Sequence, residues 1–274
     1  MTHLRPKPGR TCAEAARQLD ILALEAHNAI TQGGHPVGKV LPRYIEWVEK
    51  AERQLRSLFV AREPIDHLIG VRYWHLRSLR YGAERAFNLI EAEVEAQREY
   101  LTRHAAALQQ LHDAHQLPAG TVAVVPDTNV FLHYDPFDQL PWCKEVGARR
   151  VRLVLPLPVI DELDAQTYAR DERVRRRAKA ALRRLRELRG LAEPTAVVPV
   201  TSTVDLQVMA DSTDPVTHDN GDREILSHCE LLQTIVGEGS VIVATGDNGM
   251  QLRAQLLGLR GHLLSEELRS QRED

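Results

Sequence analysis

The 274-residue sequence predicts an all-α module followed by an α/β domain with a short parallel sheet. Mostly continuous apolar runs, typical of strands covered on both faces, occupy residues 121–125, 151–155, 196–200 and 241–245. Helical patterns separate these runs, and such alternation favours right-handed crossovers and a parallel sheet between helical layers. Before Leu117 the patterns are helical only, so we expect the chain to divide there.

The first part of the chain has the pattern of a helical bundle. Its helical stretches cover residues 11–30, 41–60, 64–82 and 83–115. In the last stretch a heptad-like stripe is formed by Phe87, Ile90, Val94, Leu101, Leu108 and Leu111, and Gln97 and His104 fall on the same stripe. This spacing indicates a helix that packs on other helices. The stripe fits a bundle that packs on itself, a homo-oligomer, or a module that binds a protein partner.

We expect three segments: the helical module at residues 1–118, the α/β domain at 121–264, and a charged tail at 265–274 that frays. In the α/β domain, helical patterns cover residues 158–189, 223–236 and 249–257. The first of these helices should break around 169–171, and a final edge strand is expected at 261–264.

The composition argues against secreted disulfide-bonded and membrane-spanning proteins. Cys12, Cys143 and Cys229 are far apart and odd in number, which favours a reduced, cytoplasmic protein. No stretch approaches the roughly 20 apolar residues that a membrane span requires. The formal net charge of −3 does not by itself indicate a partner, because the charges are unevenly spread.

Acidic residues stand where the predicted strands end or the following helices begin. Asp127 and Asp247 each follow a strand, whereas Glu162 and Asp222 fall at the start of a helix. Because carboxyl ends of parallel strands meet at one edge of a sheet, all four acids should lie there. Each taken singly is a routine turn or N-cap residue. Together, with no Lys or Arg close enough in sequence to neutralise them, they would repel one another unless cations were bound.

A group of three or four carboxylates has the oxygen donors that Mg²⁺ or Mn²⁺ prefers. No His or Cys cluster with zinc spacing competes with it in the sequence. Two such ions can activate a water and stabilise the leaving oxygen of a phosphodiester without a Ser or His nucleophile. The acids therefore predict phosphodiester hydrolysis.

Sequence blocks around these acids follow one another between residues 121 and 264. They read PDTNVFL at 126–132, LPLPVIDELD at 155–164, DREIL at 222–226 and VATGD at 243–247, followed by LRA at 252–254 and LG at 257–258. In these blocks the chain resembles the PIN domain nucleases. The resemblance implies a three-layer α/β/α fold and metal-dependent hydrolysis of single-stranded RNA. The site that it implies consists of Asp127, Glu162, Asp222 and Asp247, with Asn129 orienting a carboxylate and Thr245 adding a hydroxyl near the metal.

The third acid is open between two residues of the loop at 211–222. Asp222 is preferred because its spacing to Ile225 puts it on the first turn of the next helix, but Asp219 could replace or assist it. Asp164 is a candidate for an outer-shell acid, although on a helix it points away from Glu162.

The segment 170–189 carries a strongly basic surface beside an apolar stripe. Its candidate nucleic-acid contacts are Arg170, Arg173, Arg176, Arg177, Arg183 and Arg184. Such residues can bind phosphates in a salt-dependent way without reading sequence. A charge run is also typical of a solvated helix face, or of a surface that docks an acidic partner.

We therefore expect a metal-dependent endoribonuclease that acts on single-stranded RNA, with single-stranded DNA as another substrate to be tested. A non-catalytic RNA-binding or scaffold protein with a remnant acidic site is the alternative from a different class. A toxin-like RNA cleaver that a partner holds inactive shares the chemistry and differs in regulation.

Overall fold

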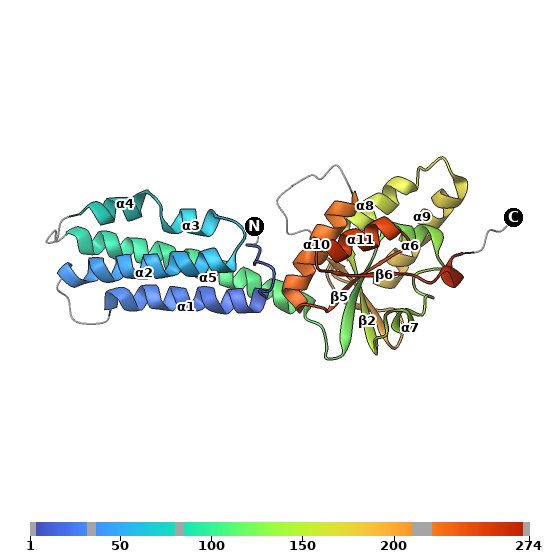
Figure 1. The fold of residues 1–274 in the computed structure, drawn as a ribbon, viewed down its shortest axis with the longest axis horizontal. Helices are drawn as coiled ribbons and strands as arrows, with labels where there is room; N and C mark the ends of the chain where they lie inside the picture. The colour runs from blue at the N-terminus through green and yellow to red at the C-terminus, as the bar shows by residue number, and fades with distance from the viewer. Residues whose placement is uncertain (1–3, 32–36, 80–84, 210–220, 271–274) are drawn as a thin grey trace. The chain divides into compact units, whose positions relative to one another are not determined.

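The computed structural model describes residues 4–31, 37–79, 85–209 and 221–270. The chain forms two units, Met1–Asp113, called the helical unit, and Ala114–Asp274, called the α/β unit. Figure 1 shows that the first consists of helices and that the second contains the sheet. Among the described helices, none combines the length and the apolar character that crossing a bilayer requires.

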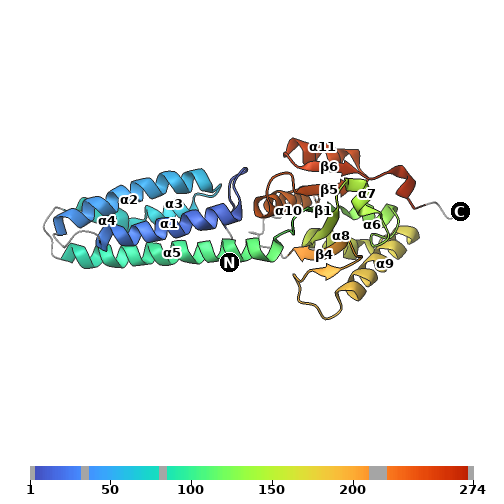
Figure 2. The same ribbon diagram turned by 90° about the horizontal axis from the view of Figure 1, so that it is seen from below.

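The helices that begin in the helical unit are α1 (Cys12–Thr31), α2 (Val37–Leu58), α3 (Glu63–Leu68), α4 (Val71–Ser78) and α5 (Arg85–His115). Helices α1, α2 and α5 run alongside one another in both views (Figures 1 and 2). The prediction of one helix over 64–82 is wrong, because the chain breaks between α3 and α4. Gly70 is extended there, with ψ −175°, and acts as the N-cap of α4.

The apolar stripe predicted on α5 forms part of the core of the helical unit. Ile90, Val94 and Leu101 are each at most 1% exposed. Gln97 is buried on the same stripe, where its amide donates to the carbonyl of His67 at 3.2 Å and to Glu93 Oε1 at 2.8 Å. These bonds compensate the amide for the water that it loses.

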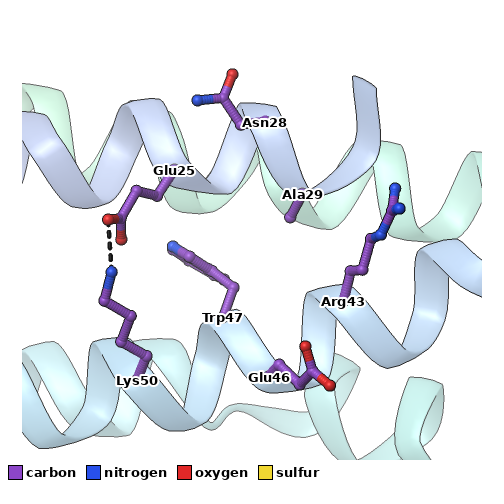
Figure 3. Close-up of a pocket in the computed structure, with 7 residues that line it drawn as sticks. All are labelled: Glu25, Asn28, Ala29, Arg43, Glu46, Trp47 and Lys50. Carbon is purple, nitrogen blue, oxygen red and sulfur yellow. Dashed lines mark hydrogen bonds and ion pairs between the residues drawn. The ribbon is translucent and has the colours of Figure 1, made fainter. Parts of the chain in front are cut away.

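Helices α1 and α2 are joined by polar contacts around a buried tryptophan. Trp47 Nε1 donates to the carbonyl of Leu22 at 3.1 Å, and Lys50 Nζ lies 2.5 Å from Glu25 Oε1 (Figure 3). A cavity of about 480 Å³ beside them is lined by Glu25, Asn28, Ala29, Arg43, Glu46, Trp47 and Lys50. Two acidic and two basic side chains line it, so this cavity lacks the excess positive charge that would attract a polyanion.

The α/β unit contains a six-stranded, mostly parallel sheet in the order β3-β4-β2-β1-β5-β6. The strands are β1 (Thr121–Pro126), β2 (Arg150–Pro156), β3 (Val198–Pro199), β4 (Val204–Met209), β5 (Val241–Thr245) and β6 (Arg260–Leu263). All neighbouring pairs are parallel except β3 and β4. Strands β1 and β5 are in register from Ala123 with Val241 to Pro126 with Ala244, so they end at the same edge.

The prediction of a parallel strand at 196–200 is wrong. That run contains only the two-residue antiparallel β3, whereas the parallel strand on the outer side of β2 is β4, which was not predicted. Asp205 and Gln207 interrupt the apolar run of β4, and their partners come from elsewhere in the unit. Arg150 lies 3.5 Å from Asp205, and the Gln207 amide donates to the carbonyl of Ala114 at 2.7 Å.

Helices lie on both faces of the sheet, which confirms the predicted α/β/α class (Figures 1 and 2). They are α6 (Thr128–His133), α7 (Trp142–Val146), α8 (Leu157–Gln166), α9 (Glu172–Arg189), α10 (Gly221–Val236) and α11 (Asn248–Leu256), with a short 3₁₀ helix, η1 (Glu266–Leu268). Strands β2 and β4 lie on one side of β1 in the sheet, and β5 and β6 lie on its other side. Right-handed crossovers therefore put the connections on opposite faces.

The break predicted around 169–171 is confirmed. Helix α8 ends at Gln166, and Asp171 caps α9 by accepting from the backbone amides of Arg173 and Val174 at 2.8 and 3.2 Å. An aspartate N-cap satisfies donors that a helix leaves unpaired at its first turn. The short helices α6 and α7 were not predicted.

We expected the tail from Ser265 onwards to fray, but the described residues Ser265–Ser270 are held by backbone hydrogen bonds. The amide of Asp135 donates to the carbonyl of Leu268 at 3.0 Å, and the amide of Ser270 donates to the carbonyl of His133 at 3.1 Å. These backbone bonds hold the segment against the residues that follow α6. We call residues 265–270 the carboxy-terminal strap.

Candidate functional site

Asp127 lies at the carboxyl end of β1, where it is 3% exposed. Its Oδ1 accepts from the backbone amide of Val130 at 3.1 Å and so caps α6. Its Oδ2 accepts from Thr245 Oγ1, which comes from the end of the neighbouring strand β5. The side chain of Asn129 also donates to this carboxylate. The predicted orienting role of Asn129 and Thr245 therefore has a geometric basis.

Burial raises the pKa of the Asp127 carboxyl to about 6. The hydrogen bonds from Thr245, Val130 and Asn129 act in the opposite direction, because they stabilise the ionised form. The nearby carboxylate of Asp222 raises this pKa further. Asp127 and Asp222 are thus close enough for their charges to interact, although they are far apart in the sequence.

Asp247 follows β5 and is linked to Asp127 through Thr245. Its backbone amide donates to Thr245 Oγ1 at 2.9 Å, while that hydroxyl donates to Asp127. The exposed carboxylate of Asp247 accepts from the amide of Gly249 at 2.8 Å and caps α11. Its Oδ2 can accept further bonds, because Oδ1 makes the cap.

Glu162 lies on α8, which follows β2, but the prediction that it falls at the start of the helix is wrong, because α8 begins at Leu157 and has no acid in its first turn. Its Oε2 accepts from Thr128 Oγ1 at 2.7 Å, so it is tied to the residue after Asp127. A Cβ at Gly221 would be 3.6 Å from the same oxygen, which places the start of α10 beside Glu162. Asp164 is exposed two positions farther along α8, and about 200° of helix rotation separates the two side chains.

Asp222 lies in the first turn of α10, as expected from its spacing to Ile225. Its Oδ2 is 2.6 Å from the Arg253 guanidinium of α11. The sequence-based expectation that no Lys or Arg neutralises the four acids is therefore wrong for Asp222, because folding brings α11 beside α10. Asp219, the competing third acid, lies outside the described residues.

The acids supply the oxygen donors that Mg²⁺ or Mn²⁺ prefers, but they do not form a closed ligand cage. Within the described ranges, no three His, Cys, Asp or Glu side chains are grouped closely enough to hold an ion. The residues nevertheless fit a divalent cation in chemistry, because burial and Asp222 both disfavour ionised Asp127 and a cation would relieve this. A shared site requires Asp222 to exchange Arg253 for the cation.

Several arginines that were predicted to bind nucleic acid make contacts within the protein. Arg173 donates to the carbonyl of Ser270 at 2.8 Å, and Arg177 donates to the Ser270 hydroxyl at 2.7 Å. Arg184 lies 2.7 Å from Asp138. Half-buried Arg173 and Arg177 thus help to hold the carboxy-terminal strap.

The other predicted arginines are exposed. Arg170 lies in the turn before α9, while Arg176 and Arg183 lie on α9 itself. Arg183 is 3.8 Å from Glu187, a long contact between two exposed side chains that contributes little stability. These three residues remain sterically accessible to a phosphate backbone.

Comparison with known protein families matches the PIN domain at residues 124–262, just over half of the chain. The chain belongs to the PIN domain family. PIN domains are generally nucleases, most often act on RNA, and typically use divalent metals such as Mg²⁺ or Mn²⁺. The helical unit has no family match, and the search of curated proteins found no match to the chain.

Three residues around the PIN domain acids were not singled out from the sequence. Thr128 binds Glu162, Arg253 pairs with Asp222, and Tyr134 lies close enough to Asp127 to interact electrostatically. Adjacency to Asp127 was an available signal for Thr128. Arg253 belongs to the LRA block at 252–254, but its pairing with Asp222 depends on how α10 and α11 pack.

Proposed function

We propose that the α/β unit is a metal-dependent endoribonuclease that hydrolyses single-stranded RNA, with Mg²⁺ or Mn²⁺ held by Asp127, Glu162, Asp222 and Asp247. Membership of the PIN domain family supports the reaction class. The observation that carries the assignment is Asp127, a buried carboxylate at a strand end whose pKa is raised by burial and by a second acid. Such a group is typical of a functional site.

The surrounding side chains would prepare the carboxylates for this task. Thr245 and Asn129 fix Asp127, and Thr128 fixes Glu162, so these acids are oriented before any ligand arrives. A bound divalent cation would lower the pKa of a coordinated water and stabilise charge on the phosphodiester. Asp164 is a weaker candidate because it faces away from Glu162, and Asp219 stays a proposal.

The substrate would be held by exposed cationic residues. Arg170, Arg176 and Arg183 are available for phosphate contacts. Arg173, Arg177 and Arg184 could contact a phosphate only in addition to their present partners within the protein, or in place of them. Single-stranded DNA is a further substrate to be tested. We also propose a cytoplasmic protein whose helical unit mediates oligomerisation or binds a protein partner.

The direct test is cleavage of labelled single-stranded RNA by the purified full chain with Mg²⁺, Mn²⁺ or chelator, with single-stranded DNA in parallel. Asp127→Asn should abolish cleavage while circular dichroism stays unchanged. Asp161→Asn is the matched control, because Asp161 is an exposed acid next to Glu162. Cleavage that survives Asp127→Asn, or that is indifferent to chelator, would overturn the assignment.

The second candidate is a non-catalytic RNA-binding or scaffold protein with a remnant acidic site. The Asp222–Arg253 pair favours it, since an internal cation already neutralises one acid. Calorimetry with Mn²⁺ on the wild type and on Glu162→Gln separates the two. A working site should bind the ion and lose affinity in the variant, whereas a remnant site should show no such loss.

A further inference from the structure

A cavity of about 330 Å³ opens beside Asp247 in the α/β unit. The residues that line it include Asn129, His133, Tyr134, Gly246, Asp247 and Arg269. They come from α6 and the residue after it, from the turn after β5, and from the carboxy-terminal strap. This volume lies at the lower end of the range for small-ligand pockets, roughly 300 to 1,000 Å³.

The lining of the cavity carries charges of both signs. Asp247 is one of the four acids of the candidate metal site, and Asn129 donates to another of them, Asp127. His133 and the cationic Arg269 line the same cavity. Burial lowers the pKa of His133, and Arg269, Arg177 and Arg173 lower it further, whereas Asp171 raises it.

The carboxy-terminal strap brings Arg269 to the cavity. Arg269 forms an isolated antiparallel bridge with Tyr134, and its guanidinium lies 5.9 Å from the centre of that ring. Its ion pair with Glu266, at 3.1 Å, joins two exposed side chains and is therefore weak. The strap follows the PIN domain match at 124–262, so Arg269 lies outside the matched residues.

The hydroxyl of Tyr134 is an unsatisfied polar group beside this cavity. It is buried and has no hydrogen-bond partner among the described residues, although buried hydroxyls are normally satisfied. A Cβ at Gly246 would lie 2.8 Å from this hydroxyl, so only glycine lets the ring stand against the turn after β5. The hydroxyl is therefore buried against Gly246, behind the cavity wall.

We propose that this cavity is a nucleotide subsite, which receives the RNA nucleotide next to the cleaved bond, with Arg269 contacting its phosphate. The proposal rests on the proposed nuclease function. An RNA strand would place one phosphate at the metal held by the acids and the neighbouring phosphate beside Arg269. A strand with regularly spaced phosphates suits a cation next to a metal site better than a protein partner does.

The test is binding of a labelled single-stranded RNA of about ten nucleotides by the full chain in chelator, followed by fluorescence anisotropy at several salt concentrations. Arg269→Gln should weaken binding about threefold to tenfold and reduce the salt dependence by about one phosphate contact. Arg149→Gln is the matched control, since exposed Arg149 precedes β2 at the opposite edge of the sheet. An Arg269→Gln protein that binds like Arg149→Gln would overturn the proposal.

A second variant separates binding from folding. Tyr134→Phe removes only the unpartnered hydroxyl, which is buried, and should leave both RNA binding and the unfolding temperature unchanged. Loss of binding accompanied by unfolding of both variants would count against a subsite. A wild type that binds a nucleoside monophosphate as tightly as the RNA would also overturn the proposal. Because chelator prevents metal-dependent cleavage, a subsite confirmed by binding would stand even if the wild type proved unable to cut RNA.

Discussion

Glu93 in the helical unit and Asp127 in the α/β unit are both buried carboxylates, 4% and 3% exposed, but their surroundings differ. Glu93 accepts from the Gln97 amide at 2.8 Å and lies 3.6 Å from the Arg72 guanidinium. Asp127 accepts from a hydroxyl and from amides, and the charge of another acid, Asp222, acts on it.

This difference separates a structural acid from a candidate functional one. A buried charge costs several kcal/mol unless it is paired, and Arg72 and Gln97 provide that compensation for Glu93. The hydrogen bonds to Asp127 do not offset the effects of burial and of Asp222 on its pKa, so its ionised form remains unfavourable in the described structure. Burial alone therefore does not distinguish the two acids, whereas burial next to a second acid is an arrangement typical of functional sites.

The largest expected effect is on cleavage. Asp127→Asn should lower the rate on single-stranded RNA by at least about a thousandfold, because the amide cannot replace a charged ligand. Glu93→Gln should leave the rate within about twofold, because Glu93 belongs to the other unit. Single-turnover rates in Mn²⁺ measure both. Equal losses in the two variants would remove the distinction.

The next effect is on the pH dependence of stability in chelator. The pKa of Asp127 is raised in the folded state to about 6, so its contribution to stability is complete below the unfolded value of 3.8 and is lost as pH rises through about 6. The free energy of unfolding of Asp127→Asn, relative to that of the wild type, should therefore be higher at pH 7.5 than at pH 4 in the metal-free protein. The expected difference is at most roughly 2 to 3 kcal/mol. Urea unfolding at both pH values tests this, with Asp161→Asn as the control. A pH-independent difference would contradict the raised pKa.

Glu93→Gln should act in the opposite direction. The change removes the charge that faces Arg72 and alters the bond to Gln97, so the helical unit should lose about 1 to 2 kcal/mol at pH 7.5. Glu95→Gln is the control, because Glu95 lies on the same helix in an exposed pair with Arg98 and should cost less than about 0.5 kcal/mol. Urea unfolding followed by circular dichroism compares them. Similar losses would show that burial of Glu93 carries no special weight.

The smallest effect concerns Arg253. Arg253→Gln removes the ion pair with Asp222, whose side chains are 50% and 37% exposed, and should tighten Mn²⁺ binding by up to about fivefold. Arg260→Gln is the control, since Arg260 donates to the carbonyl of Gly239 instead. Calorimetry measures both. Weaker Mn²⁺ binding in Arg253→Gln would mean that the pair orders the site instead of competing with the cation.

Local patterns predicted most of the α/β unit. The strand 241–245 and the break between α8 and α9 are confirmed, because continuous apolar runs and an aspartate N-cap are readable in a few consecutive residues. Strand β4 was missed because Asp205 and Gln207 are polar residues that are typical of loops. Their partners, Arg150 and the carbonyl of Ala114, are known only from the folded structure.

The sequence by itself determined that Asp127 and Asp247 follow strands and that Asp222 lies in the first turn of a helix, because strand and helix limits are set by local periodicity. Only the tertiary structure decided the partners of these acids. The pairing of Asp222 with Arg253 and the position of Arg269 in the same cavity as Asp247 join residues from separate elements, and such arrangements depend on how those elements pack.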